Sequence, residues 1–372
     1  MKKKINILII GAGRIAEQHA YAYKNQNLFY TNMPFEINLY YLVDKNFKIL
    51  NKVKKKFNFN YSSISWKKAL NDEAIDIVDI CTPNNSHYEI IKYAAKKKKF
   101  IYCEKPISNT LNESKKIKNL VNRNRVGSFI GYNYLHIPLV KRAKKIISSG
   151  ELGKINYFRS VFNQDFFSDP NKIFSWRFSK LEGGSGVLQD LASHTIAFAL
   201  YFFEDITEVV SYMDTLIKKR KFKNNLIKVQ NFDNLKVLMK FKHGFSGLIE
   251  SSRVFTGKKW DLSFEIQGEN GSIYFNNENM NEMLLYKKNS KINKSGFIKL
   301  YPNVKDNYQK YFNPLDGFNL GFNDQKLIEI NQMLESYNNK TKSDFDINFA
   351  HKISKVTDAI EKSYYMKSWK KV

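Results

Sequence analysis

Short apolar runs alternate with longer segments of helical periodicity over the first third of the chain. A strand, a turn and a helix follow one another repeatedly, and this order is typical of a parallel sheet covered by helices. We therefore predict a Rossmann-type doubly wound sheet in a domain that covers residues 1–131. Its strands are expected at residues 5–10, 37–43, 75–81, 100–103 and 128–131, and its helices at residues 14–24, 46–57, 65–70, 87–98 and 111–124.

The pattern changes after residue 131, where long strand-like runs follow one another through turns such as His243-Gly244. Consecutive strands joined by turns indicate an antiparallel sheet. A helix at residues 186–203 interrupts the strands. We therefore predict a second α/β domain, residues 132–372, with a large and mostly antiparallel sheet. Its strands are expected at residues 155–163, 206–217, 226–242, 245–255 and 260–275, and its other helices at 138–149, 324–337 and 349–364.

The chain has a large excess of basic side chains. Its 372 residues include 61 Lys and Arg against 35 Asp and Glu, a formal net charge of +26. Such an excess occurs in proteins that bind nucleic acids or anionic surfaces. However, no nucleic-acid-binding motif accompanies it, and the lysine runs at 52–56 and 96–99 end predicted helices, where cations complement the helix dipole. We interpret the excess as a solvated surface, and we expect neither a nucleic-acid nor a membrane partner; anionic substrates stay open.

Cysteine usage and hydropathy bear on the compartment. Cys81 and Cys103 are the only cysteines, too few for a disulfide framework, and we expect both to be free thiols. The apolar run after lysines 2–4 stops after six residues, which is too short for a signal peptide. No stretch approaches the roughly 18 apolar residues that a membrane span requires. We therefore expect a cytoplasmic protein.

The run Gly11-Ala12-Gly13-Arg14-Ile15-Ala16 lies between a predicted strand and a predicted helix. Its first glycine permits the turn, its second lets the backbone approach a pyrophosphate, and the helix N-terminus attracts the negative charge. Such a run alone is weak evidence, but the strand–turn–helix context supports a dinucleotide site. We expect Gly11, Gly13, Arg14 and Ile15 to bind the cofactor.

Asp44 ends the second predicted strand. An acidic side chain there accepts hydrogen bonds from the adenosine ribose hydroxyls and repels a 2′-phosphate, which favours NAD. The adjacent Lys45 offers a cation to such a phosphate, so NADP stays open as the alternative. We expect no metal ion.

Two polar motifs, Thr82-Pro83-Asn84 and Glu104-Lys105-Pro106, follow neighbouring strands of the predicted sheet. The carboxyl ends of parallel strands form the edge at which open α/β sheets bind ligands. A lysine held at this edge can stabilise the alkoxide form of a reacting hydroxyl. The alternative is that Lys105 is one of many surface lysines.

The segment from Gly183 to His194 combines a glycine-rich entry with an acid and an imidazole. Asp190 and His194 stand four residues apart on one predicted helix and so share a face. Oxidation of an alcohol requires loss of the hydroxyl proton, and histidine titrates near working pH. Asp190 is a candidate to orient the imidazole or to contact substrate hydroxyls. A surface ion pair is the alternative, although the apolar Leu188 and Leu191 favour a buried helix.

With these motifs the chain resembles the glucose–fructose oxidoreductase / inositol dehydrogenase / rhizopine catabolism (Gfo/Idh/MocA) family over almost its whole length. The resemblance also rests on His19, on Gly131-Tyr132-Asn133 and on the ending 346–372 with Trp369. It implies a Rossmann domain and an α/β domain whose open sheet makes homodimer or homotetramer contacts. It further implies a catalytic set with His194 as general base and a set of residues near the nicotinamide. The first set is Lys105, Asp190 and His194; the second is Thr82, Asn84, Glu104, Lys105 and Asn133.

The run Phe174-Ser175-Trp176-Arg177-Phe178 resembles the family branch that contains inositol-type and levoglucosan-type dehydrogenases. Trp176 would stack on a sugar face or the cofactor, and Arg177 would pair with a phosphate or hydroxyl. A core position for Trp176 and a surface ion pair for Arg177 are the alternatives. That branch often carries Arg where this chain has Leu135-His136, which leaves the sugar open. Asn163, with its neighbours Gln164 and Asp165, is a candidate to bind substrate hydroxyls.

These observations predict an NAD(P)-dependent dehydrogenase that transfers a hydride between nicotinamide and a hydroxyl-bearing carbon of a sugar or cyclic polyol. Lys105, Asp190 and His194 would also contact the substrate. One alternative is an enzyme that retains and recycles its nicotinamide. Another is a non-catalytic sugar or NAD sensor on the same fold. The complete catalytic set argues against the sensor, because a binding protein needs no acid–base group.

Overall fold

The computed structural model describes the whole chain except residues 1, 289–295, 307–308, 313–314 and 316–318. Its internal contacts divide it into two compact units. Unit 1 comprises Met1–Asn133 and Gly321–Lys352, and unit 2 comprises Tyr134–Leu320 and Ile353–Val372. The domains predicted from the sequence were two continuous segments divided at residue 131, whereas each unit is built from two segments.

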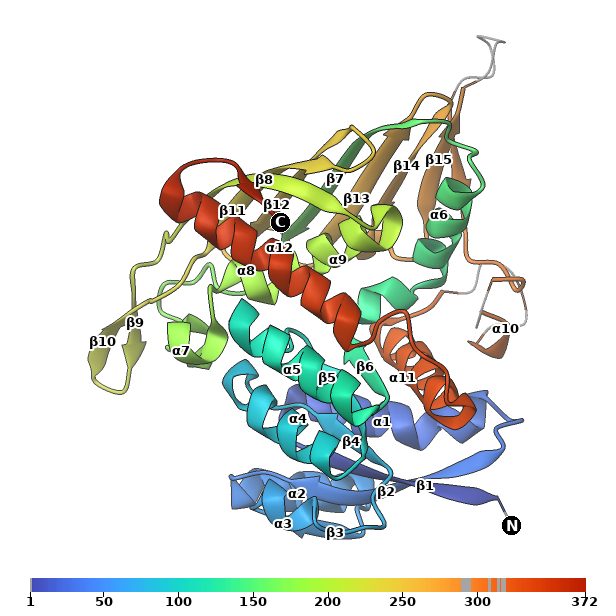
Figure 1. The fold of residues 1–372 in the computed structure, drawn as a ribbon, viewed down its shortest axis with the longest axis vertical. Helices are drawn as coiled ribbons and strands as arrows, with labels where there is room; N and C mark the ends of the chain where they lie inside the picture. Colours follow the sequence, from blue (N-terminus) through green and yellow to red (C-terminus); the bar gives the residue numbers. More distant parts are fainter. Residues whose placement is uncertain (1, 289–295, 307–308, 313–314, 316–318) are drawn as a thin grey trace. The chain divides into compact units, whose positions relative to one another are not determined.

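A six-stranded parallel sheet with the order β3-β2-β1-β4-β5-β6 forms the centre of unit 1 (Figure 1). The order reverses between β1 and β4, and sheets of this kind bind ligands beyond the carboxyl ends of the strands at such a reversal. The predicted doubly wound sheet is confirmed, although the short β3 had no predicted counterpart. The strands are β1 (Lys3–Ile10), β2 (Phe35–Val43), β3 (Tyr61–Ser63), β4 (Ile77–Ile80), β5 (Phe100–Glu104) and β6 (Ser128–Gly131).

Helices connect these strands, and their ends follow local sequence rules. Asn46 begins α2 because its side chain accepts hydrogen bonds from the backbone N–H groups of Lys48 and Ile49. Thr110 begins α5 in the same way, by accepting from the N–H of Glu113. The helical segments are α1 (Arg14–Phe29), α2 (Phe47–Phe57), α3 (Trp66–Ala69), η1 (Asn84–Ser86), α4 (His87–Lys96), α5 (Leu111–Asn124) and α11 (Phe322–Asn339).

The segment Gly321–Lys352 joins unit 1 through buried contacts that are remote in the sequence. The Gln26 side chain on α1 donates a hydrogen bond to the backbone oxygen of Leu327 on α11, at 2.9 Å. The Tyr337 hydroxyl donates to Asp76 at 2.8 Å. The sequence prediction placed residues 321–352 in the second domain, because the local pattern of α11 does not show which part of the chain it packs against. The contacts with Gln26 and Asp76 place this segment in unit 1.

Three side chains from α1, β4 and β5 meet in the core of unit 1. His19 Nδ1 lies 2.9 Å from Asp79 Oδ2, and His19 Nε2 lies 2.9 Å from Glu104 Oε1. Each ring nitrogen thus faces a carboxylate oxygen, and only the imidazolium form of His19 has an N–H donor for both. Burial alone would lower the pKa of His19, but the charge of Asp79 and the hydrogen bonds to both carboxylates outweigh it and raise the pKa.

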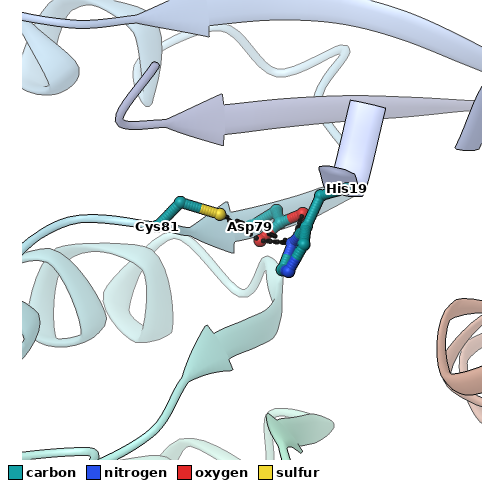
Figure 2. A group of neighbouring side chains, drawn as sticks. All are labelled: His19, Asp79 and Cys81. Carbon is teal, nitrogen blue, oxygen red and sulfur yellow. Dashed lines mark hydrogen bonds and ion pairs between the residues drawn. The ribbon is translucent and has the colours of Figure 1, made fainter. Parts of the chain in front are cut away.

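Cys81 completes the group that Figure 2 shows. His19, Asp79 and Cys81 offer ligand atoms that all lie within 4.8 Å of one another, a geometry that could hold a metal ion. However, the Cys81 sulfur lies 3.3 Å from Asp79 Oδ1, where a thiol donates a hydrogen bond. Burial and the charge of Asp79 raise the pKa of Cys81 in this arrangement. Hydrogen bonds thus connect the three side chains.

Lys326 on α11 supplies a second buried cation to the same cluster. Its ammonium group lies 3.1 Å from Glu104 Oε1 and 2.5 Å from Glu329 Oε2, and its side chain is 2% exposed. Burial would raise the pKa of Glu104, but the charge of Lys326 and the contact with His19 hold that pKa well below its usual range. Glu104 is therefore ionised at the end of β5, directly before Lys105.

Unit 2 is built on a nine-stranded sheet with the order β16-β15-β14-β13-β7-β12-β11-β8-β17 (Figure 1). The neighbouring strands are antiparallel except for β7 and β12, which are parallel. The sheet is therefore mixed and mostly antiparallel, as predicted. Its strands are β7 (Ile155–Asn163), β8 (Ile206–Asp214), β11 (Asn234–Phe241), β12 (Ser246–Ser252), β13 (Asp261–Gly268), β14 (Gly271–Asn276), β15 (Met283–Lys287), β16 (Phe297–Leu300) and β17 (Lys370–Lys371).

One face of this sheet packs against the apolar helix α9. A separate hairpin pairs β9 with β10, and β10 takes up the beginning of the predicted strand 226–242, so that run is interrupted before β11. The predicted strand 206–217 is present as β8, which ends at Asp214. None of the helices among the described residues combines the length and the apolar character needed to cross a membrane. The remaining elements are η2 (Asn133–His136), α6 (Pro138–Ser148), η3 (Trp176–Phe178), α7 (Lys180–Gly183), α8 (Val187–Asp190), α9 (Ala192–Phe203), β9 (Lys219–Phe222), β10 (Asn225–Lys228), η4 (Asn277–Asn279), α10 (Gln309–Phe312) and α12 (Ile347–Met366).

Removal of the Lys326 cation is expected to destabilise unit 1 strongly. The substitution Lys326→Ala leaves Glu329 buried without its cation and weakens the pairing of Glu104, and breaking a buried ion pair typically costs roughly 3–5 kcal/mol. Denaturant unfolding followed by circular dichroism measures the effect. Lys56→Ala is the matched control, because Lys56 pairs with Glu17 at the surface of the same unit and such pairs contribute about 0–1 kcal/mol. Equal effects of the two substitutions would contradict a stabilising buried cluster.

The His19 imidazolium predicts a specific pH dependence. Because its pKa is raised in the folded state, the stability that it contributes is fully present below the unfolded pKa of about 6.5 and is lost as the pH rises through the folded value. The difference in unfolding free energy between the wild type and His19→Gln should therefore be largest near pH 6 and shrink at alkaline pH. Denaturant titrations at a series of pH values measure it. A difference that stays constant with pH would show that His19 is neutral.

Candidate functional site

The glycine-rich turn after β1 has room for a ligand on one side and none on the other. Gly11 has a φ of +101°, and a Cβ atom there would lie 2.6 Å from the backbone oxygen of Cys81, so a larger residue does not fit. A Cβ atom on Gly13 would meet nothing within 4 Å. Gly13 and Arg14 are exposed at the N-terminus of α1, with Ile15 half-buried beside them. The bare backbone at the positive end of a helix is the arrangement that binds a pyrophosphate.

Asp44 ties this turn to the end of β2. Its Oδ2 accepts a hydrogen bond from the N–H of Ala12 at 2.8 Å, and its Oδ1 accepts one from the N–H of Asn46 at 2.7 Å. A carboxylate has about four acceptor positions, so ribose hydroxyls can still donate to it. The residues present therefore fit the adenosine and pyrophosphate parts of NAD.

Two loops at the carboxyl edge of β4 and β5 carry the other predicted cofactor residues. The Thr82 hydroxyl accepts from Ser86 at 2.7 Å, and Asn84 donates from its side chain to Asn109 at 3.1 Å. Lys105 is half-buried, and the peptide bond between it and Pro106 is cis. Asn133, 8% exposed, ends the first segment of unit 1.

His87 connects these two loops, a role that the sequence did not indicate. Its Nε2 lies 2.9 Å from the Thr82 carbonyl and its Nδ1 lies 3.0 Å from the Pro106 carbonyl. Burial lowers the pKa of His87, which favours the neutral ring with a single N–H donor. With one N–H, the neutral ring donates to only one of these two carbonyl oxygens, so His87 lies between the loops of Thr82 and Lys105 and forms a hydrogen bond with one of them.

His194 is enclosed by aromatic side chains of unit 2. It is 6% exposed, and its ring lies edge-on to Tyr134 and Phe162, with centroid distances of 4.7 and 5.8 Å. The Trp260 indole N–H donates to the Tyr134 hydroxyl at 2.6 Å, which fixes the Tyr134 ring. None of these aromatic neighbours was predicted, because they come from η2, β7 and the loop before β13. Their effect is to hold the imidazole in one orientation in an apolar setting.

Asp190 and His194 lie on two successive helices, so the prediction of one continuous helix over 186–203 is wrong. The chain turns at Leu191, between α8 and α9, where φ is −104°. Asp190 Oδ2 lies 3.7 Å from Arg177 Nε, and both side chains are partly exposed. The Arg177 guanidinium also lies over the half-buried Trp176 ring, 4.4 Å from its centroid. The structure thus joins Trp176, Arg177 and Asp190 in one group.

The glycines that precede α8 have a structural explanation. Gly186 has a φ of +67°, and a Cβ atom there would lie 2.5 Å from the backbone oxygen of Phe232. Its neighbour Val187 donates a backbone hydrogen bond to the same oxygen, at 3.0 Å. Close packing against the protein's own backbone therefore explains the glycine at position 186.

Asn163 stands at the end of β7 with its side-chain oxygen buried and without a hydrogen-bond partner among the described residues. Gln164, beside it, is also buried, whereas Asp165 forms an ion pair with Lys259. A buried acceptor without a protein partner is a candidate for a ligand hydroxyl.

The predicted site residues divide between the two units. Lys105 and the cofactor residues belong to unit 1, and the residues of unit 2 are Asn163, Trp176, Arg177, Asp190 and His194.

Known proteins resemble the chain over its whole length. The family model for an oxidoreductase family with an NAD-binding Rossmann fold matches residues 5–132, and the model for the GFO/IDH/MocA C-terminal domain matches residues 140–274. Levoglucosan dehydrogenase of Pseudarthrobacter phenanthrenivorans is 29% identical over 381 residues, covering 99% of this chain and 98% of that protein. Myo-inositol 2-dehydrogenase of Thermotoga maritima is 26% identical over 274 residues, covering 73% and 75% of the two chains.

Solved structures agree with these matches. Levoglucosan dehydrogenase in complex with NADH and levoglucosan has a TM-score of 0.96 and 30% sequence identity, covering 100% of both chains. The predicted family and the NAD cofactor are confirmed. The chain is a member of the Gfo/Idh/MocA family and an NAD-dependent dehydrogenase.

Proposed function

We propose that this dehydrogenase oxidises a ring hydroxyl of a neutral sugar or cyclic polyol, and catalyses the reverse reduction, with Lys105 and His194 serving the same oxygen atom. The observation that carries the proposal is the buried imidazole of His194 among Tyr134, Phe162 and Trp260. A fixed imidazole in an apolar setting suits a base that removes a hydroxyl proton. The relatives named for levoglucosan and myo-inositol supply the substrate class.

Bound NAD supplies the acceptor for the hydride that leaves the carbon atom. In the proposal, backbone groups of the glycine-rich turn bind its pyrophosphate and Asp44 binds its ribose. The residues assigned to it are Gly11, Gly13, Arg14, Ile15, Asp44, Thr82, Asn84, Glu104, Lys105 and Asn133. The open space beside Gly13 supports this assignment.

The hydroxyl proton goes to His194 as the C–O bond becomes a carbonyl. Lys105 stabilises the negative charge that develops on the oxygen, because an ammonium group in a site sheltered from water lowers the energy of an alkoxide. Asp190 holds the substrate or the imidazole, and Asn163 accepts a hydrogen bond from another ring hydroxyl.

The pairing of Arg177 favours a neutral substrate. Its guanidinium is balanced by Asp190 and lies over Trp176. A phosphate ester would have to compete with the Asp190 carboxylate for this cation. The flat face of Trp176 instead suits the C–H groups of a sugar ring.

We also infer a homodimer or homotetramer that forms through the sheet of unit 2, and a cytoplasmic location. Tyr212 on β8 and Leu238 on β11 are 62% and 52% exposed, whereas Val209 and Val237 on the same strands are buried. Exposed apolar side chains on one face of a sheet support a partner surface. The free thiols Cys81 and Cys103 support a reducing compartment.

Loss of either acid–base group is expected to abolish most of the activity. Lys105→Met and His194→Ala should each lower kcat by about 10²–10⁴-fold, the usual contribution of general acid–base catalysis. The absorbance of reduced nicotinamide measures turnover, and quenching of protein fluorescence measures NADH binding, which His194→Ala should leave unchanged. His243→Ala, in an exposed turn of unit 2, is the control. Normal turnover by both variants would refute the assigned chemistry.

The charge balance at Arg177 predicts which substrates the enzyme accepts. Neutral pyranoses, anhydrosugars and inositols should show a higher kcat/KM than the same sugars carrying a phosphate. Asp190→Asn leaves the Arg177 cation without its carboxylate and should shift this preference toward the phosphorylated sugar by about tenfold, since a charged hydrogen bond contributes roughly 1.5–3 kcal/mol. Steady-state kinetics on matched pairs such as glucose and glucose 6-phosphate measure the shift. A wild type that prefers the phosphorylated member would contradict a neutral substrate.

A further inference from the structure

We propose that Asn231 is a positioning residue for substrate binding. With Arg253, it fixes the backbone of the substrate loop, defined as residues 175–186, and thereby places Arg177 for its contact with Asp190. This inference rests on the proposed function, because it concerns the residues assigned to the sugar. Neither Asn231 nor Arg253 contacts the substrate in the proposal. They act through the loop.

A single buried amide group bonds three backbone carbonyls of the substrate loop. Asn231 is 3% exposed, and its Nδ2 lies within hydrogen-bonding distance of three backbone carbonyl oxygens. These belong to Arg177 at 2.9 Å, Gly184 at 3.2 Å and Ser179 at 3.4 Å. Two N–H donors are thus shared among carbonyls at both ends of the loop. Most of these carbonyls lie in an irregular segment, where no sheet would satisfy them.

Arg253 supports the amide from the opposite side. Its Nη2 donates to Asn231 Oδ1 at 2.7 Å, and its Nη1 donates to the Arg177 carbonyl at 3.1 Å. Its Nε donates to Asp233 Oδ1 at 2.9 Å, in an ion pair whose two side chains are 1% exposed. The guanidinium therefore fixes which side of the Asn231 amide is oxygen and which is nitrogen.

Asp233 in turn is held by the backbone. Its Oδ2 accepts hydrogen bonds from the N–H groups of Leu216 and Ile217, each at 3.0 Å. Every polar group in the chain from Asp233 through Arg253 to Asn231 thus has a partner. Buried ionic groups that are fully paired favour one arrangement over its competitors.

Close packing removes the remaining freedom of the loop. A Cβ atom on Gly183 would lie 2.9 Å from the Arg177 carbonyl oxygen, and one on Gly186 would lie 2.9 Å from the Asn231 side chain. The loop therefore fits directly onto Asn231. The hydrogen bonds to the Arg177 carbonyl fix the backbone of this residue. The Arg177 side chain reaches Trp176 and Asp190 from that fixed backbone position.

The substitution Asn231→Asp separates this role from general stability. It keeps the shape of the side chain and the oxygen that accepts from Arg253, but it replaces the donor to the loop carbonyls with a second acceptor. Asn281→Asp is the matched control. Asn281 donates from its side chain to the Leu320 carbonyl and accepts from the Leu320 N–H, so the same substitution removes a donor to a backbone carbonyl outside the substrate loop.

Two measurements on the full-length enzyme test the proposal. We expect Asn231→Asp to raise the KM for the sugar by about tenfold or more, with a smaller change in kcat, because a displaced positioning group weakens binding before it changes the chemistry. NADH affinity should be unchanged. Trypsin should cut after Arg177 faster in this variant than in the wild type, because its carbonyl is no longer held. Asn281→Asp should match the wild type in both assays.

The outcomes distinguish this proposal from the proposed function. A wild type that oxidises no sugar or polyol would refute the function, while the trypsin assay would still report whether Asn231 holds the loop. An active wild type with an unchanged KM and unchanged cleavage in Asn231→Asp would overturn the positioning role. If Asn231→Asp does not fold, Asn231→Ser carries the same test, since it is neutral, smaller and retains at most one donor. The same increases in KM and cleavage are expected, and their absence overturns the proposal.

Discussion

The buried pairing of Glu104 is the interaction on which the cofactor-binding half of this protein depends. The carboxylate is held between the imidazolium of His19 and the ammonium of Lys326, so α1, β5 and α11 meet at one atom, Oε1. Gly131 on β6 packs against the same oxygen, and a Cβ atom at this position would lie 3.0 Å from it. A buried carboxylate without a cation would be protonated or would prevent folding. With its two cations it stays ionised next to Lys105, the residue to which we assign stabilisation of the reacting oxygen.

Unit 2 uses the same physical device for a different purpose. The buried Arg253–Asp233 pair holds Asn231, and Asn231 holds the loop of Trp176 and Arg177. In both units a residue that we assign to the reaction is exposed or half-exposed, while the charged groups behind it are buried and paired with opposite charges. Breaking such a pair is strongly destabilising, whereas an exposed ion pair contributes little. The exposed Arg177–Asp190 contact alone therefore cannot hold the substrate loop; the buried network behind it can.

Local signals in the sequence were sufficient for the parallel sheet, the glycine-rich turn and the candidate residues at strand ends, because each depends on neighbours within a few positions. Gly11 is an example: its turn follows from the strand before it and the helix after it. The placement of α11 against unit 1 was not predictable in this way, since Gln26 and Leu327 meet only in the folded chain. The break at Leu191 was also missed, because apolar residues continue through it without a helix-breaking residue. The roles of Asn231 and Arg253 were not predictable from the sequence, because an isolated Asn or Arg in a strand-rich region is most simply interpreted as a surface residue.

The positive net charge takes on a clearer meaning once the buried cations are considered separately. Lys326, Arg220 and Arg253 are each buried, and each is balanced locally by carboxylates or backbone carbonyls. Arg220, for example, donates to the carbonyls of Asp169 and Phe167 and lies over the Phe178 ring. The cation assigned to the substrate, Arg177, is likewise balanced by Asp190. Nearly all of the net charge of +26 therefore resides in side chains outside these networks, and the surface charge and the choice of a neutral substrate are separate properties of the chain.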